Sequence, residues 1–217
     1  YRTVRQISRE LDKKINLEIE GGQVELDRSV LDRVGAPLEH MLRNALAHGI
    51  EPAAARARAG KNETGEIKIA LRQEGNEIVI MVSDDGGGID LDKLRRKAVE
   101  KGLLGDGQQP REAELIQFIF ASGLSTTDEV TELAGRGVGM DVVRNEIAAL
   151  GGRIEVATRR GQDTTFTIYL PLTLAVTQAV LVRAGADFYA IPSAMVGQVL
   201  KIKPETLARY HQSGAVQ

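Results

Sequence analysis

The fold of this chain is decided by the stretch Glu39-His-Met-Leu-Arg-Asn-Ala-Leu-Ala-His-Gly-Ile-Glu51, and the rest of the sequence can be interpreted outward from it. Its polar side chains His40, Asn44 and His48 recur every fourth residue, and apolar residues occupy most positions between them. This spacing predicts an amphipathic helix on which the polar side chains form one stripe. A solvated helix face has the same pattern, but asparagine is unfavourable within a helix, which suggests a separate role for Asn44.

A second stretch, Val82-Ser-Asp-Asp-Gly-Gly-Gly-Ile-Asp90, follows an apolar run over residues 78–82 that predicts a central strand. Asp84 keeps the register of the alternate strand residues, so its carboxylate is expected to point into a pocket. Gly86 and Gly88 would let a ligand approach the backbone, although an ordinary turn uses the same residue types. An imidazole and amide stripe beside a carboxylate suits a nucleotide with its metal, because an amide oxygen is a hard ligand suited to Mg2+.

Helical and strand patterns alternate along the rest of the chain. Strands over 66–72 and 78–82 should pair as an antiparallel hairpin. Pro37 predicts a bend or a break in the long helix near Gly35-Ala36. Residues 51–60 predict a short surface helix or loop, and the polar stretch 121–139 predicts a loop. Helices are predicted over 4–11, from Asp27 or Ser29 to 46, and over 91–101, 112–120 and 138–150; further strands are predicted over 15–20, 153–159 and 164–170.

The segment beyond Pro171 has a different pattern. Residues 174–183 and 187–191 predict two further short strands. A segment of about 45 residues is too short to hold a hydrophobic core alone. We therefore divide the chain into an α/β domain over residues 1–171 and the beginning of a second, all-β domain over residues 172–217.

Composition narrows the classes of function. The chain has 217 residues, no cysteine and a net charge of -2, with the two signs interspersed. The absence of cysteine excludes a disulfide scaffold, a thiolate zinc site and a cysteine nucleophile, and no basic face for nucleic acid is evident. No apolar run approaches the roughly 20 residues of a membrane span, and the first residues lack the form of a signal peptide. We expect a cytoplasmic piece of a longer protein, without membrane insertion.

A glycine-rich stretch, Gly135-Arg-Gly-Val-Gly139, opens the last predicted helix of the first domain. Backbone N–H groups at a helix N-terminus can bind phosphate, although a plain hinge has the same composition. The stretch matches neither the phosphate loop G-x-x-x-x-G-K-[ST] nor the dinucleotide fingerprint. Lys93 and Lys97, one helical turn apart, could reach a polyphosphate or belong to a solvated face.

These motifs, taken in order, resemble a known set. They resemble the N, G1, G2 and G3 boxes of the Bergerat-type ATPases, a superfamily that includes gyrase, the ninety-kilodalton heat-shock chaperone, the mismatch-repair ATPase and the histidine kinases. In the order of the four boxes, the matching motifs are His40-x-x-x-Asn44, Asp84-x-Gly86-x-Gly88, Gly135-x-Gly137-x-Gly139 and Gly161-x-x-Thr164-x-Phe166. Within it the chain resembles the CheA-type chemotaxis kinases, through the run from His40 to Glu51 and through Phe118-Ile-Phe120, Gly135-Arg-Gly-Val-Gly-Met-Asp-Val-Val143 and Leu170-Pro-Leu-Thr-Leu174. The resemblance covers nearly the whole chain.

The resemblance implies a two-layer α/β sandwich that binds ATP and Mg2+. Asn44 falls where the family holds Mg2+, and His40 stands where gyrase-like relatives place a catalytic glutamate. Asp84 falls where a carboxylate binds the adenine amine, and Thr164 lies on the strand that floors the pocket. Arg43 and His48 match polar residues of the nucleotide site, Lys93 and Lys97 match lysines near the phosphates, and Gly135, Gly137 and Gly139 match the hinge of the ATP lid.

The implied activity is histidine kinase activity, with transfer of the γ-phosphoryl of Mg-ATP to a histidine. None of the three histidines, His40, His48 and His211, lies in a stretch that resembles a phosphotransfer helix. The acceptor is therefore expected on a separate histidine phosphotransfer domain, phosphorylated in trans. The resemblance also implies a response regulator, a CheW-like adaptor and chemoreceptors as partners, a homodimeric full-length protein, and a CheW-like regulatory domain that begins within residues 172–217.

The sequence departs from the family pattern at several positions. Ala47 stands where many CheA-type kinases carry aspartate, and Ser122 and Leu124 replace a proline and a phenylalanine of the lid. Asp163 replaces the second glycine of the last box, where a carboxylate would repel phosphates unless it points away. The changes suit a divergent hybrid kinase such as those that control type IV pili. They leave two alternatives, a GHKL ATPase and a nucleotide-binding scaffold without kinase turnover.

Overall fold

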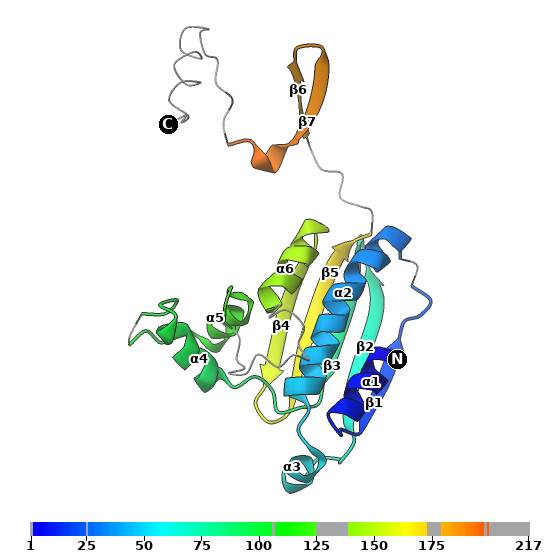
Figure 1. Cartoon of the computed structure of the whole chain (residues 1–217), viewed down its shortest axis with the longest axis vertical. Coiled ribbons are helices and arrows are strands. Elements are labelled where there is room, and N and C mark those ends of the chain that lie inside the picture. Colours follow the sequence, from blue (N-terminus) through cyan, green and yellow to red (C-terminus); the bar gives the residue numbers. More distant parts are fainter. Residues whose placement is uncertain are drawn as a thin grey trace. The chain divides into compact units, whose positions relative to one another are not determined.

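The computed structural model describes residues 2–24, 26–105, 107–124, 139–172, 179–197 and 199. The chain divides into two compact units, Tyr1–Ala175 and Val176–Gln217. The first unit contains a five-stranded sheet in the order β1-β2-β3-β5-β4. Helices α1, α2 and α6 lie across one face of that sheet (Figure 1), which makes the unit a two-layer α/β sandwich and confirms the predicted fold class.

β2 alternates buried with more exposed side chains, as a half-buried strand does, whereas the central strand β3 has three consecutive buried residues at 78–80. β2 (Gly65–Glu74) and β3 (Glu77–Asp84) form the predicted antiparallel hairpin, with Ile67 and Ile69 buried. β5 (Asp163–Pro171) pairs antiparallel with both β3 and β4 (Arg153–Arg159), and β1 (Ile15–Glu20) pairs parallel with β2. This pairing sets Asp84, the last residue of β3, directly opposite Thr164 on β5.

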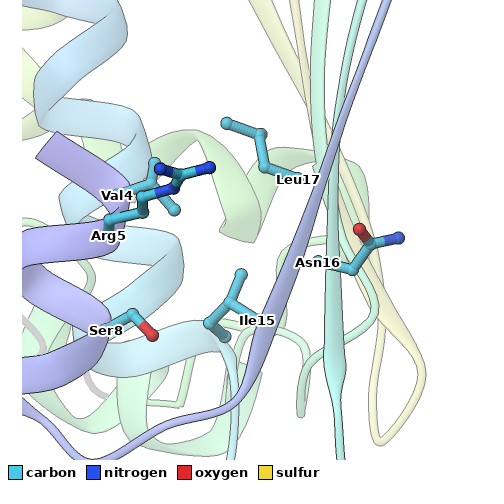
Figure 2. Close-up of a pocket in the computed structure, with 6 residues that line it drawn as sticks. All are labelled: Val4, Arg5, Ser8, Ile15, Asn16 and Leu17. Carbon is cyan, nitrogen blue, oxygen red and sulfur yellow. The ribbon is translucent and has the colours of Figure 1, made fainter. Parts of the chain in front are cut away.

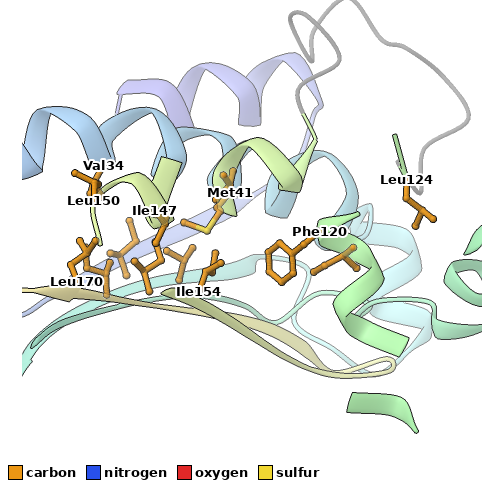
Figure 3. Packing of buried hydrophobic residues seen from close by; sticks show 14 of the residues in the cluster. Val34, Met41, Phe120, Leu124, Ile147, Leu150, Ile154 and Leu170 are labelled. Carbon is orange, nitrogen blue, oxygen red and sulfur yellow. The ribbon is translucent and has the colours of Figure 1, made fainter. Parts of the chain in front are cut away.

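The hydrophobic core lies between the helices and the sheet. Val34 and Met41 of α2 (Arg28–Asn44) pack with Ile147 of α6 (Met140–Ala149) above Ile154 and Leu170 of the sheet (Figure 3). A second cluster joins α1 (Arg2–Glu10) to the end of the α2 segment. The described part of this unit also contains α3 (Ala53–Arg58), α4 (Leu91–Glu100), α5 (Glu112–Leu115) and a 3-10 turn at Ile116–Phe120.

The long helix differs from the sequence prediction at two points. α2 begins at Arg28, directly after Asp27, and runs through Pro37. Of the bend or break predicted near Gly35-Ala36, the break is therefore wrong and the bend stays a prediction. Pro37 is buried, and Arg33, whose carbonyl loses its helical hydrogen-bond donor, is exposed, so water can replace that bond. The helix then changes geometry, and Ala45–Gly49 form a π-helical turn that the sequence pattern did not predict.

The second unit contains a hairpin of β6 (Ala179–Ala184) and β7 (Asp187–Pro192), followed by a 3-10 turn at Ser193–Met195. The two predicted strands are thereby found, except that residues 174–178 lie outside the described residues. Leu181 and Phe188 on the hairpin are 67% and 65% exposed. The assignment of residues 172–217 to a CheW-like domain stays a prediction. Among the helices that the structure describes, none has the length and apolar character required to cross a membrane.

Candidate nucleotide-binding site

The site begins where α2 ends in its π-helical turn. The Ile50 amide donates to the Ala45 carbonyl at 2.7 Å, which closes the wide turn, and such turns are frequent at functional sites. Lys13 also stabilises this turn, because its Nζ donates to the carbonyls of Leu46, Ala47 and Ile50 at 2.7, 3.1 and 2.7 Å. A cation at the carbonyl end of a helix satisfies groups that would otherwise lack partners.

The two histidines of the stripe are kept neutral by their surroundings. Partial burial, with the Arg43 guanidinium nearby, lowers the pKa of His40, although Glu146 and Asp141 oppose the shift. His48 lies at the helix end and is exposed as a residue. Partial desolvation of its imidazole, followed by the charges of Lys13 and Lys93, still lowers its pKa. A neutral imidazole can accept a proton, so either side chain can act as a base near pH 7.

Asn44 lies between them and points toward the start of α6. Its amide Nδ2 donates to the Met140 sulfur at 3.3 Å, a weak contact. This orientation uses the amide nitrogen and leaves the amide oxygen as a ligand for a hard cation. Arg43, next to Asn44, forms an ion pair with Glu39 at 3.5 Å. The described residues contain no cluster of three or more His, Cys, Asp or Glu side chains that could hold a metal, so a cation here would depend on Asn44, water and ligand oxygens.

Asp84 ends β3 and is only 7% exposed. Its Oδ1 accepts a hydrogen bond from the Gly86 amide at 3.0 Å. Burial, followed by the charges of Asp85, Asp163 and Glu51, raises the pKa of Asp84 to about 6, although the Gly86 hydrogen bond opposes the shift. A buried carboxylate of this kind benefits from a ligand donor such as an amine.

Two glycines bring the helix end and the strand end together. The Gly87 amide donates to the Gly49 carbonyl at 2.9 Å. A Cβ on Gly86 would lie 2.1 Å from the same Gly49 oxygen, and a Cβ on Gly49 would lie 2.9 Å from Asp84 Oδ1. Position 86 therefore requires glycine, because its Cβ would meet backbone, whereas the close atom at Gly49 is the end of a side chain. The structure thus brings Asp84 close to Gly49, at the His48 end of the polar stripe, through a backbone contact that the sequence did not reveal.

The β4–β5 hairpin is bonded to the glycine turn on its other side. The Gly87 carbonyl accepts from the Gly161 amide at 2.7 Å, and Thr158 Oγ1 accepts from the Ile89 amide at 2.9 Å. Thr158 Oγ1 also donates to the Asp163 carbonyl at 2.8 Å and lies 3.4 Å from Thr164 Oγ1. Thr164, a predicted site residue, is therefore beside the turn, and Thr158 is a neighbour that sequence reasoning missed.

The structure also explains the residue types at Gly88 and Asp163, which lie at the contact with the β4–β5 hairpin. Gly88 has a φ of +71°, and a Cβ there would lie 2.6 Å from the Arg159 carbonyl, so the position requires glycine. The Asp163 carboxylate forms an ion pair with Arg159, and this hydrogen bond lowers the pKa of Asp163 despite some burial. The departure at Asp163 is thus paired with a cation on its own hairpin.

The remaining predicted residues are placed less completely. Lys93 lies in the first turn of α4, where its amide donates to the Asp90 cap at 2.9 Å, and its charge contributes to the lowered pKa of His48. Lys97 lies one helical turn further along α4. Gly139 caps the start of α6, whereas Gly135 and Gly137 lie outside the described residues.

A separate cavity of about 200 Å³ lies between α1 and β1 (Figure 2). It is lined by Val4, Arg5, Ser8, Ile15, Asn16 and Leu17. None of the predicted site residues lines it, so it is not the cavity that the sequence motifs predict.

Comparison with known proteins agrees with this geometry. Residues 34–174 match the family described as histidine kinase-, DNA gyrase B-, and HSP90-like ATPase. The chain is 46% identical over 208 residues to the chemotaxis protein CheA of Treponema pallidum, covering 96% of this chain and 26% of that protein. It is 44% identical to the sensor histidine kinase CheAY of Helicobacter pylori, covering 95% and 26%, and 43% identical to the gliding motility regulatory protein of Myxococcus xanthus, covering 94% and 26%.

The chain spans about a quarter of the length of these relatives. The matched family segment contains the polar stripe, the glycine turn and the β4–β5 hairpin together. The chain belongs to the histidine kinase-, DNA gyrase B-, and HSP90-like ATPase family, which implies that it binds ATP.

Proposed function

We propose that this chain contains the ATP-binding kinase unit of a CheA-type chemotaxis histidine kinase. Its reaction would be transfer of the γ-phosphoryl of Mg-ATP, in trans, to a histidine on a separate phosphotransfer domain. The observation that carries the proposal is the backbone contact between Gly49 and Gly87, because it holds the turn after Asp84 against the helix end that follows His48. The names of the CheA relatives support the same assignment.

The base would be held at the strand end. Asp84 would accept the exocyclic amine of adenine, and Gly86 and Gly88 would let the ring approach the backbone. Thr164, opposite Asp84, would floor the pocket. The buried carboxylate gives up little water when the amine arrives, so the contact would be selective for adenine over bases without that donor.

The phosphates would extend along the helix stripe. Asn44 would hold Mg2+, which when bound supplies positive charge next to the phosphate oxygens. Lys93, Lys97 and Arg43 would bind phosphate oxygens, and Gly135, Gly137 and Gly139 would form the hinge that lets a lid close. His40 and His48, both neutral at pH 7, would orient the incoming acceptor or take its proton. Phosphoryl transfer of this kind depends mostly on positioning and charge neutralisation.

The proposed partners follow from the relatives. We infer a phosphotransfer domain, a response regulator, a CheW-like adaptor and chemoreceptors, with residues 172–217 as the beginning of a CheW-like regulatory domain and a homodimeric full-length protein. No part of the proposal involves nucleic acid.

The test is transfer of labelled γ-phosphate from Mg-ATP to a histidine phosphotransfer domain of a CheA-type kinase. Wild type should label the acceptor, and Asn44→Ala should lose the label. Met140→Leu is the matched control, because it removes the Asn44–Met140 contact and keeps the amide oxygen. Nucleotide binding without label on any acceptor would overturn the kinase proposal in favour of a scaffold, and turnover without acceptor would favour an ATPase.

A further inference from the structure

Arg56 is a fully buried charged residue outside the predicted site, with an exposed fraction of 0%. It lies on α3, a segment for which the sequence predicts a surface helix or loop; the helix is present, but this side chain is not at the surface. Its guanidinium contacts Glu51 Oε2 at 3.1 Å and Asp85 Oδ2 at 2.6 Å. It also donates to the carbonyls of Asp85 and Asn62 at 3.2 and 2.6 Å.

Lys61 adds a second cation to the same cluster. Its Nζ donates to Glu51 Oε1 at 2.9 Å and to the carbonyls of Asp85 and Gly86 at 2.9 and 2.7 Å. The Lys61 side chain is 16% exposed and that of Glu51 23%, so these contacts are largely shielded from solvent. Both cations are thus bonded to the turn that directly follows Asp84.

The turn is fixed from two sides as a result. On the inner side Gly86 N bonds Asp84 Oδ1, and Gly87 N bonds the Gly49 carbonyl. On the outer side the carbonyls of Asp85 and Gly86 are held by Arg56 and Lys61, and Asp85 Oδ1 accepts from the Glu66 amide at 2.9 Å. Because Gly86 N orients the Asp84 carboxylate, any rotation of the Asp85–Gly86 peptide would turn that carboxylate.

Burying a guanidinium costs desolvation free energy, and a well-packed apolar side chain often stabilises such a position at least as well. What an apolar side chain cannot do is bond carbonyls and two carboxylates at fixed angles. The cluster also pairs Glu51 and Asp85 with cations, which limits the repulsion that these two acids exert on Asp84. Both effects concern the orientation and charge of the site rather than packing.

We propose that Arg56 and Lys61 are positioning residues that hold the Asp84–Gly86 turn in the orientation that recognises the exocyclic amine of the base. The inference rests on the proposed adenine contact of Asp84. Its consequence is that the two cations act on base selectivity, although neither belongs to the polar stripe or the turn itself.

The experiment compares dissociation constants for ADP and inosine diphosphate, which carries a carbonyl where adenine carries the amine, by calorimetry on the whole chain. Wild type should prefer ADP by about tenfold or more, the value of one hydrogen bond to a charged group. Arg56→Met and Lys61→Met should each lose most of this preference, and Arg56→Lys should keep part of it. The ratio does not depend on the folded fraction, so a loss of stability cannot mimic the result.

Arg58→Met is the matched control, because Arg58 lies on the same helix, is exposed and donates only to the Ala54 carbonyl among the bonds of the described residues. It should keep the wild-type preference. Variants at Arg56 and Lys61 that melt earlier but keep the preference would overturn the inference and leave a purely structural role. If Arg56→Met does not fold, the preferences of Lys61→Met and Arg56→Lys decide between a positioning role and a purely structural role. A wild type without preference, or an Asp84→Asn variant that keeps it, would instead refute the adenine contact on which the inference rests.

Discussion

Replacing Asp84 with asparagine should stabilise the unliganded protein while it removes the proposed adenine acceptor. The new side chain would have nearly the same shape, and its amide oxygen could still accept from the Gly86 amide at the 3.0 Å position. The change removes a buried negative charge whose pKa is raised from 3.8 to about 6 by burial and by the nearby acids Asp85, Asp163 and Glu51. The variant should therefore gain the free energy that ionisation of Asp84 costs in the folded state.

The magnitude follows from the shift. About two pKa units correspond to roughly 3 kcal/mol in the free energy of unfolding, as an upper figure. The folded state binds the Asp84 proton more tightly than the unfolded state does. This group's contribution to wild-type stability is therefore greatest below pH 3.8 and falls as pH rises to about 6. The advantage of the variant should be complete at pH 8 and about half as large at pH 5.

The assay is urea unfolding of the whole chain at both pH values, followed by circular dichroism, with ADP titrations in parallel. Asp84→Asn should unfold at a higher urea concentration at pH 8 and should bind ADP more weakly than wild type. A variant that is no more stable than wild type at pH 8, or that shows the same advantage at pH 5 and pH 8, would refute the reasoning about the buried charge.

Three further predictions concern the same site. ADP affinity of the wild type should fall about tenfold between pH 7 and pH 5 as Asp84 becomes protonated, measured by calorimetry; a flat profile would contradict the role of the carboxylate. Gly86→Ala should weaken ADP binding at least tenfold, because its Cβ would lie 2.1 Å from the Gly49 carbonyl. Gly87→Ala should be tolerated, because its Cβ would meet nothing closer than 3.7 Å. Equal effects of the two changes in filter-binding assays would count against the backbone contact. Lys13→Met should lower the free energy of unfolding by about 1–3 kcal/mol, because carbonyls of the π-helical turn lose their charged donor. Lys14→Met should have little effect in the same urea assay, because it removes an exposed ion pair with Glu63.

The local part of the structure could be predicted from the sequence. Alternating apolar residues in β2 and a nearly continuous apolar run in β3 predicted their hairpin, and the register of β3 placed Asp84 at its buried end. The strands over residues 153–159 and 164–170 were also predicted, although their pairing was not. In each case the pattern depends on neighbours in the sequence, which is why it could be recognised without the fold.

Contacts between distant segments could not be predicted in this way. Lys13 lies 33 or more residues from the carbonyls that it bonds, and Arg56 reaches Asp85 across 29 residues. In the sequence both are ordinary charged residues of polar segments, and nothing in their spacing indicates burial. The π-helical turn at residues 45–49 was missed for a similar reason, because it is held in part by Lys13 from outside the helix.

Pro37 and Asp163 show how context reverses a local rule. A proline is expected to break a helix, but burial of its ring and exposure of Arg33 let α2 continue. An acid beside a phosphate site is expected to be unfavourable, but Arg159 on the same hairpin pairs with Asp163. In both cases the local rule leaves out the surroundings of the residue, which only the structure shows.

The most direct test of the central claim is an ADP titration of isotope-labelled protein, followed by the backbone amide shifts in NMR spectra. The account predicts the largest changes at Gly49 and at Gly86–Gly88, with smaller ones at Asn44 and Thr164. Amides around the cavity of α1 and β1, such as Ser8 and Asn16, should not move. Changes concentrated at that cavity, or none at the Gly49–Gly87 contact, would contradict the claim that this junction holds the nucleotide.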